Sequence, residues 1–113
     1  MQRDDQVYVG HMLDMSRKAT EKVRALGRPD YDEDENLRLA LAHLVQVIGE
    51  AARRVSNDVR EAHPEIPWAD IVGMRSKIVH DYMNVDEDIV CEVVTRDLPA
   101  LVAALEKVTP GDA

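Results

Sequence analysis

The residues best suited to chemistry lie close together, in residues 75–82. Arg75 carries a permanent charge on a planar fork of donors, a shape that fits a phosphate group. His80 is a histidine, the side chain whose charge changes near neutral pH, and Tyr82 follows it after one intervening residue. The three side chains therefore form a candidate site that could hold a phosphodiester and move a proton.

The spacing of Arg75 and His80 restricts how they can meet. On a continuous α-helix the five-residue step turns the chain so that the two directions differ by about 140°. The two side chains therefore do not share one stripe of a helix. Either the helix ends between them, or a two-fold dimer brings two arginines and two histidines into one cleft.

A purely structural interpretation of the same residues remains open. Arg75 could pair with Asp70 or Asp81 on a helix surface. His80 could be a helix C-terminal residue that the helix dipole favours. Tyr82 could be a half-buried anchor whose hydroxyl stays in water.

Length and composition predict a single domain, residues 1–113, with an ordinary balance of 45% hydrophobic and 32% charged residues. The net charge of −8 argues against a general nucleic-acid coat, although it leaves room for a local basic pocket and suggests a basic partner. We expect no membrane segment and no signal sequence, and hence a cytoplasmic protein. Cys91 is the only cysteine, which excludes an intrachain disulfide and predicts a buried, inert thiol.

The elements that must position the candidate site are helices. Apolar residues recur at spacings of three and four in four segments, at residues 5–26, 33–56, 68–80 and from 86 onward. Residues 27–32 are expected to form a turn-rich linker, residues 57–62 a short helical turn, and the tail after about 108 to fray. The fold class is therefore all-α, an antiparallel bundle of four to five helices, with no strand pattern.

Single residues refine this expectation. Gly49 lies inside a strongly helical segment, where close approach of another helix would offset its cost of about 1 kcal/mol. Asp86 is a good N-cap for the last helical segment. Pro99 is expected to break or kink that segment, with Asp97 capping a renewed helix.

The sequence contains two charged clusters outside the motif. Arg53, Arg54 and Arg60 form a basic cluster that could guide RNA or bind a partner, although a solvated face is the simpler expectation. The acidic run at residues 30–35 is expected to be a loop and helix start, where the dipole favours negative charge.

A wider residue order surrounds the motif, at residues 48–52, 68–82 and 97–101. With these flanks, the order Arg, four residues, His, one residue, Tyr resembles the HepT-like branch of the HEPN superfamily. Arg75, His80 and Tyr82 match that motif position for position. The resemblance covers nearly the whole chain.

The resemblance implies a specific function. HepT-like proteins are typically toxins of two-gene toxin–antitoxin modules, and their partner is a minimal nucleotidyltransferase of the MntA kind. The toxin is a helical homodimer and commonly a metal-independent ribonuclease without a cofactor. In this chain Arg75 and His80 would then be the catalytic pair. Tyr82 would be the tyrosine to which the partner transfers AMP from ATP.

Ser76 departs from the family pattern, because the residue after the arginine is usually Asn or another strongly polar residue in active members. A serine can donate and accept a hydrogen bond but is shorter. Because of this departure, two alternatives to a ribonuclease that cleaves RNA stay open. One is a non-catalytic helical partner of a nucleotidyltransferase that serves as its AMPylation substrate at Tyr82. Another is a structural helical dimer with no chemistry.

Overall fold

The computed structural model describes residues 1–81 and 84–108 of the chain. Its elements are α1 (Arg3–Val23), α2 (Arg28–Glu33), α3 (Glu35–Arg54), α4 (Asn57–Ala62), α5 (Trp68–Val72), α6 (Met74–Ile78), β1 (Val79–Asp81), β2 (Asn84–Val85), α7 (Glu87–Glu92), the π-helical turn η1 (Val93–Asp97) and α8 (Leu98–Val108). The all-α class is confirmed. The expected count of four to five helices is not reproduced, because several helices have only five or six residues.

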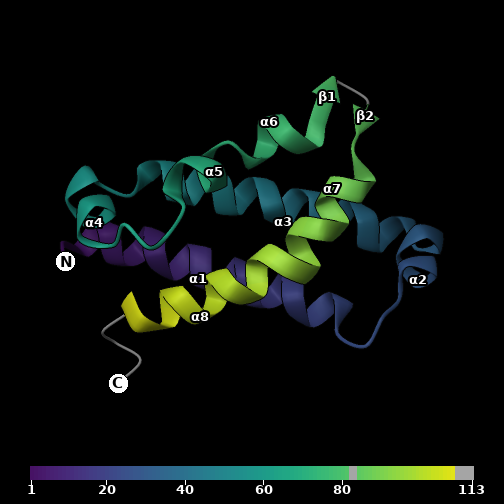
Figure 1. Ribbon diagram of the computed structural model, residues 1–113, viewed down its shortest axis with the longest axis horizontal. Coiled ribbons are helices and arrows are strands. Elements are labelled where there is room, and N and C mark those ends of the chain that lie inside the picture. The colour runs from purple at the N-terminus through teal and green to yellow at the C-terminus, as the bar shows by residue number, and fades with distance from the viewer. Residues whose placement is uncertain (82–83, 109–113) are drawn as a thin grey trace.

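α1 runs in the opposite direction to both α3 and α8 (Figure 1). α1 and α3 pack along each other, and α8 packs against α1. Their facing positions are apolar and fully buried, as at Met12 on α1, Ile48 on α3 and Leu105 on α8. The periodic patterns of residues 5–26 and 33–56 therefore predicted these core helices correctly.

The connection between α1 and α3 differs from the expected linker. α1 ends at Val23, and Ala25 takes a left-handed backbone with φ 63°, which stops the helix early. α2 then forms within the acidic run. Its first turn contains Pro29, and the Gly27 N–H donates to the Asp30 carboxylate at 2.9 Å. The expectation of a turn-rich linker at residues 27–32 is therefore wrong.

The helix expected at residues 68–80 is interrupted. α5 ends at Val72, Gly73 forms the joint, and α6 ends at Ile78. α5 lies very close to α3, because a Cβ added at Gly49 would stand 3.0 Å from the Ile71 carbonyl oxygen. The expected close packing at Gly49 is therefore confirmed, and it fixes the start of the segment that carries the motif.

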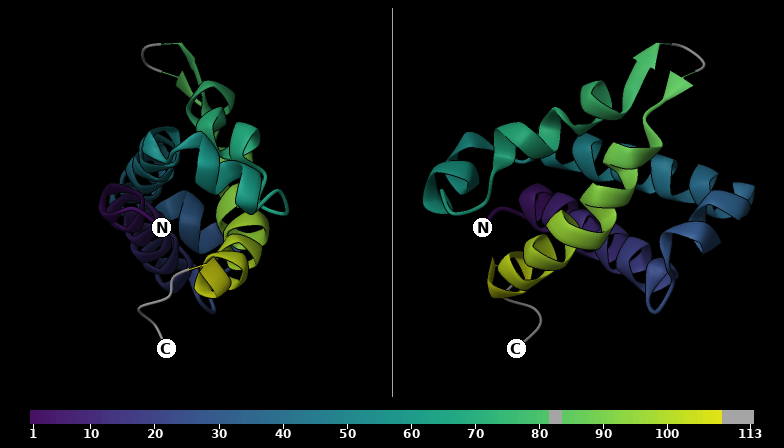
Figure 2. Two further views of the ribbon diagram at one scale, coloured as in Figure 1. Left: turned by 90° about the vertical axis from the view of Figure 1, so that its left-hand side faces the viewer. Right: turned by 45° about the vertical axis from the view of Figure 1, so that its right-hand side comes forward.

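A short strand ladder follows α6, although the sequence showed no strand pattern. β1 and β2 pair antiparallel, with Val79 opposite Val85, Asp81 opposite Asn84, and an irregularity between the two pairs. The ladder projects from the helical body (Figure 2). Val79 and Val85 are partly buried against the core, so the ladder is anchored at its base.

The last helical segment begins as expected and then continues without a break. The Asp86 carboxylate accepts a hydrogen bond from the Ile89 N–H at 3.1 Å, so the predicted N-cap is confirmed. The backbone remains helical through η1 into α8. The expected break at Pro99 and the cap at Asp97 are wrong, because the wider π-helical turn accommodates a proline that lacks an N–H.

Other expectations have simple outcomes. Cys91 is half-buried rather than buried. None of the described helices is both long and apolar enough to cross a membrane. The tail expected to fray after Val108 lies outside the described residues.

Candidate functional site

α6 presents the first residues of the motif. Met74 and Ile78 are buried at its two ends and orient the helix on the core. Arg75 and Ser76 between them are exposed. This placement follows from the helical period, because Met74 and Ile78 are four residues apart and share a stripe that the others leave.

The Arg75 guanidinium is available for an anion. It makes no ion pair or hydrogen bond with the described residues, and Asp70, one of its two possible partners, instead lies 3.8 Å from the Lys77 ammonium. A free guanidinium at an exposed helix end can take a phosphate in a bidentate geometry. The Asp70 pairing in the structural interpretation is therefore wrong for Arg75.

His80 lies on β1, beyond the end of α6. The structure describes its backbone, which continues in a strand after the last helical residue. Of the two alternatives that the spacing left open, the structure shows the helix end, since α6 ends at Ile78 rather than at residue 80. α6 then runs directly into the ladder (Figure 1). Tyr82 lies outside the described residues.

The base of the ladder is closed by the backbone. The Asp86 N–H donates to the Ile78 carbonyl oxygen at 2.6 Å. This bond joins the end of α6 to the residue that caps α7. His80 therefore lies in a short chain segment with both ends fixed.

A polar cluster at the start of α7 was not predicted. The Tyr31 hydroxyl donates to Glu87 Oε1 at 2.8 Å, and Arg38 Nε lies 3.3 Å from Glu87 Oε2. Burial, and then the hydrogen bond to Glu87, raise the pKa of Tyr31 above its ordinary value, so the phenol remains a neutral donor. These residues are far apart in sequence, and the sole hint was an aromatic residue inside an acidic run.

The basic cluster is largely engaged in structure. Arg60 donates to the carbonyl oxygens at the end of α3, with Nη2 at 2.9 Å from Ala52 and 3.0 Å from Arg53. The Arg53 guanidinium lies 3.7 Å from Glu50, and that of Arg54 lies over the Tyr8 ring. The interpretation as a solvated and structural face is therefore favoured over an RNA guide.

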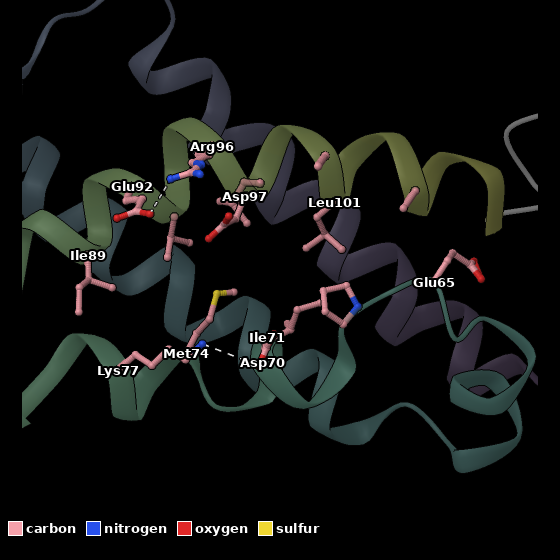
Figure 3. A pocket seen from close by; sticks show the side chains of 15 residues that line it. Glu65, Asp70, Ile71, Met74, Lys77, Ile89, Glu92, Arg96, Asp97 and Leu101 are labelled. Atoms are coloured by element: carbon pink, nitrogen blue, oxygen red, sulfur yellow. Dashed lines mark hydrogen bonds and ion pairs between the residues drawn. The ribbon is translucent and has the colours of Figure 1, made fainter.

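A groove of about 440 Å³ lies between α5–α6 and the α7–η1–α8 segment (Figure 3). Ile71, Met74 and Leu101 line its floor. Its rim is charged, and two rim cations are already paired, Lys77 with Asp70 and Arg96 with Glu92. The groove contains none of the predicted site residues. Among the described residues, no group of His, Cys, Asp or Glu side chains is placed to hold a metal ion.

Comparison with known proteins identifies the family. The family model described as ribonuclease HepT-like matches residues 12–108. The chain belongs to the HepT-like family. The matched region includes α6 and the ladder that follows it, and hence the whole candidate site of this HepT-like chain.

Several relatives of this HepT-like chain carry ribonuclease names. A protein of Caldanaerobacter subterraneus, named as a candidate RNase, is 32% identical over 94 residues, covering 83% of this chain and 84% of the relative. A protein of Thermococcus cleftensis, named as a candidate ribonuclease HepT, is 31% identical over 107 residues, covering 95% and 97%. A candidate RNase of Methanocaldococcus jannaschii is 35% identical over 82 residues, covering 70% and 71%. No solved structure matches the chain.

Proposed function

We propose that this HepT-like chain is an endoribonuclease and the toxin of a two-gene toxin–antitoxin module. The observation that carries the proposal is the exposed Arg75 guanidinium, free of described partners, one helix end away from His80 in a chain of this family. The names of the relatives support ribonuclease activity. The toxin role rests on the family resemblance, and the cytoplasmic location rests on the expectation from the sequence.

The proposed chemistry uses the RNA's own nucleophile and needs no metal. The ribose 2′-oxygen attacks the adjacent phosphorus, and His80 moves a proton as general base or acid. The bond from phosphorus to the 5′-oxygen breaks, which leaves a cyclic phosphate and a 5′-hydroxyl. Arg75 stabilises the negative charge that builds on the phosphoryl oxygens. A homodimer would provide a second histidine for the other proton transfer.

Cleavage of RNA by the purified protein without its partner, in the presence of a chelator, tests this proposal. Arg75→Ala is expected to lower the cleavage rate by about 10²–10³-fold, as when a group that stabilises transition-state charge is lost. His80→Ala is expected to lower it by about 10²–10⁴-fold, the range for a general acid or base. His43→Ala and Arg96→Ala are matched controls, because both residues are exposed and lie outside the motif, residues 75–82. Unchanged activity in His80→Ala would rule out this mechanism.

The proposed partner is an MntA-type nucleotidyltransferase that transfers AMP to Tyr82. An anionic group there would repel RNA from Arg75. Mass spectrometry after incubation with the partner and ATP is expected to show the mass gain of AMP. The gain should vanish in Tyr82→Phe and persist in Tyr8→Phe. A gain that persists in Tyr82→Phe would exclude this tyrosine as the site.

The second candidate function is a non-catalytic subunit that binds the nucleotidyltransferase and is modified by it. Ser76 favours this reading, because it is exposed on α6 beside Arg75 and is shorter than the usual Asn. Ser76→Asn separates the two candidates. A ribonuclease weakened by the serine should gain cleavage activity, whereas a non-catalytic subunit should still show none.

A further inference from the structure

Glu87, the first residue of α7, uses both of its carboxylate oxygens. Oε1 accepts the Tyr31 hydroxyl at 2.8 Å, and Oε2 lies 3.3 Å from Arg38 Nε. The Glu87 side chain is 33% exposed and that of Arg38 is 25% exposed, so water screens this contact less than it would at a free surface. Two donors from separate elements therefore hold Glu87 in one orientation.

The two donors form a fixed platform. Tyr31 on α2 is 2% exposed, and its ring is part of the apolar core. Arg38 on α3 also donates through Nη1 to the carbonyl oxygens of Tyr31 and Asp32. α3 in turn packs along α1. Glu87 is therefore held in place by residues that belong to the core of the helical bundle.

On its other side Glu87 adjoins the base of the ladder. Asp86, the preceding residue, donates its N–H to the Ile78 carbonyl oxygen at 2.6 Å and caps α7 through its carboxylate. Ile78 is fully buried. The chain segment that contains β1 and the His80 backbone begins after Ile78 and ends at Asp86. These two residues are hydrogen-bonded to each other, and Asp86 directly precedes Glu87.

We propose that Glu87 is a positioning residue that sets where β1, and hence His80, stands relative to Arg75. This inference rests on the proposed ribonuclease function. Arg75 lies on α6 before Ile78, and among the described residues it makes no hydrogen bond or ion pair with the Glu87 cluster. Loss of the cluster should therefore disturb the proton-transfer group while leaving the phosphate-binding group in place.

The neighbouring Asp88 provides a matched control. Its carboxylate lies 2.7 Å from Arg28 Nη2, so this pair also joins α2 to α7. The side chains are 43% and 84% exposed, however, and an exposed ion pair contributes little. Glu87→Gln and Asp88→Asn thus remove one charge each from adjacent positions that both link α2 to α7. The Asp88 pair is more exposed and, unlike Glu87, involves no donor from α3.

Amide hydrogen exchange and steady-state RNA cleavage test the inference together. In Glu87→Gln the amides of β1 and β2 should exchange about tenfold faster, since one charge-assisted hydrogen bond is lost. The amides of α1 and α3 should be unchanged. The kcat should fall about tenfold with KM within about twofold, because binding and chemistry are served by different groups. Tyr31→Phe should shift both readouts in the same direction, and Asp88→Asn should shift neither.

Each contrary outcome has a distinct meaning. Faster exchange in all elements alike would make Glu87 a general stabiliser and overturn the inference. Unchanged exchange in β1, or an equal effect in Asp88→Asn, would also overturn it. If the wild type cleaves no RNA, the proposed function fails, and the exchange measurement alone then decides whether Glu87 holds β1.

Discussion

The α1–α3 interface and the corner where α6 meets β1 are built from opposite kinds of residue. In the interface, Met12 and Leu41 are fully buried and apolar positions repeat over the full length of both helices. At the corner, Met74 and Ile78 are buried while Arg75 between them is exposed. Two apolar anchors therefore hold a short helix that leaves Arg75 and Ser76 exposed to a ligand.

The two regions have different roles: the α1–α3 interface stabilises the fold, and the corner carries the residues proposed for chemistry. The interface derives its free energy from buried area spread over many side chains. The corner depends on a few anchors and on the polar cluster at Glu87. Substitutions in the interface should therefore change the free energy of unfolding, whereas substitutions of the exposed motif residues should change activity alone.

The largest expected stability effect comes from the interface. Leu41→Ala should lower the free energy of unfolding by about 2–5 kcal/mol, because it removes a buried side chain and leaves a cavity. Leu39 is the matched control, since it lies on the same helix and is 64% exposed. Leu39→Ala should stay within about 0.5 kcal/mol of the wild type in urea denaturation. Similar losses in both variants would contradict the assignment of the core face of α3.

A smaller loss of stability is expected at Gly49, where α3 lies close to α5, the helix that precedes α6. In Gly49→Ala the new Cβ would stand 3.0 Å from the Ile71 carbonyl oxygen. Overpacking of about 1–3 kcal/mol should offset or outweigh the gain in helix propensity of about 1 kcal/mol, for a net loss of up to about 2 kcal/mol. Gly10→Ala on α1 meets nothing within 4 Å and should be neutral or stabilising. Thermal unfolding of both variants measures this contrast, and a stabilised Gly49→Ala would exclude the close approach.

The long helices could be predicted from the sequence because many residues contribute to each pattern. The stripes of α1 and α3, the N-cap at Asp86 and the close packing at Gly49 all depend on local spacing or on one residue type. The helical stripes survive errors at single positions, whereas the cap and the glycine were each recognised from one characteristic residue. Helix ends are decided by one or two residues, and so Ala25 ended α1 earlier than the apolar pattern predicted.

The short elements could not be predicted from the sequence, because they depend on contacts between residues that are far apart in the chain. α2 packs through Tyr31, whose partner Glu87 is remote in sequence. The joint at Gly73 and the β1–β2 ladder follow from how α5 and α6 lie on the core. For the candidate site, spacing alone predicted that Arg75 and His80 do not share one helical stripe, and it left a helix end or a dimer as alternatives. The polar cluster at Glu87 was marked in the sequence only by an aromatic residue, Tyr31, inside an acidic run.

The smallest expected effects on stability are those of substituting two arginines, Arg60 and Arg75. They test directly whether residues that stabilise the fold are separate from residues that act in cleavage. Arg60 donates three hydrogen bonds to carbonyl oxygens at the end of α3, whereas Arg75 has no described partner. Arg60→Ala should therefore lower the free energy of unfolding by about 1 kcal/mol and spare RNA cleavage. Arg75→Ala should stay within about 0.5 kcal/mol of the wild type while cleavage is lost. Urea denaturation and the cleavage assay, run on the same samples, measure both quantities. If Arg75→Ala destabilises the chain as much as Arg60→Ala, the guanidinium has a structural partner and its loss of activity no longer identifies it as catalytic.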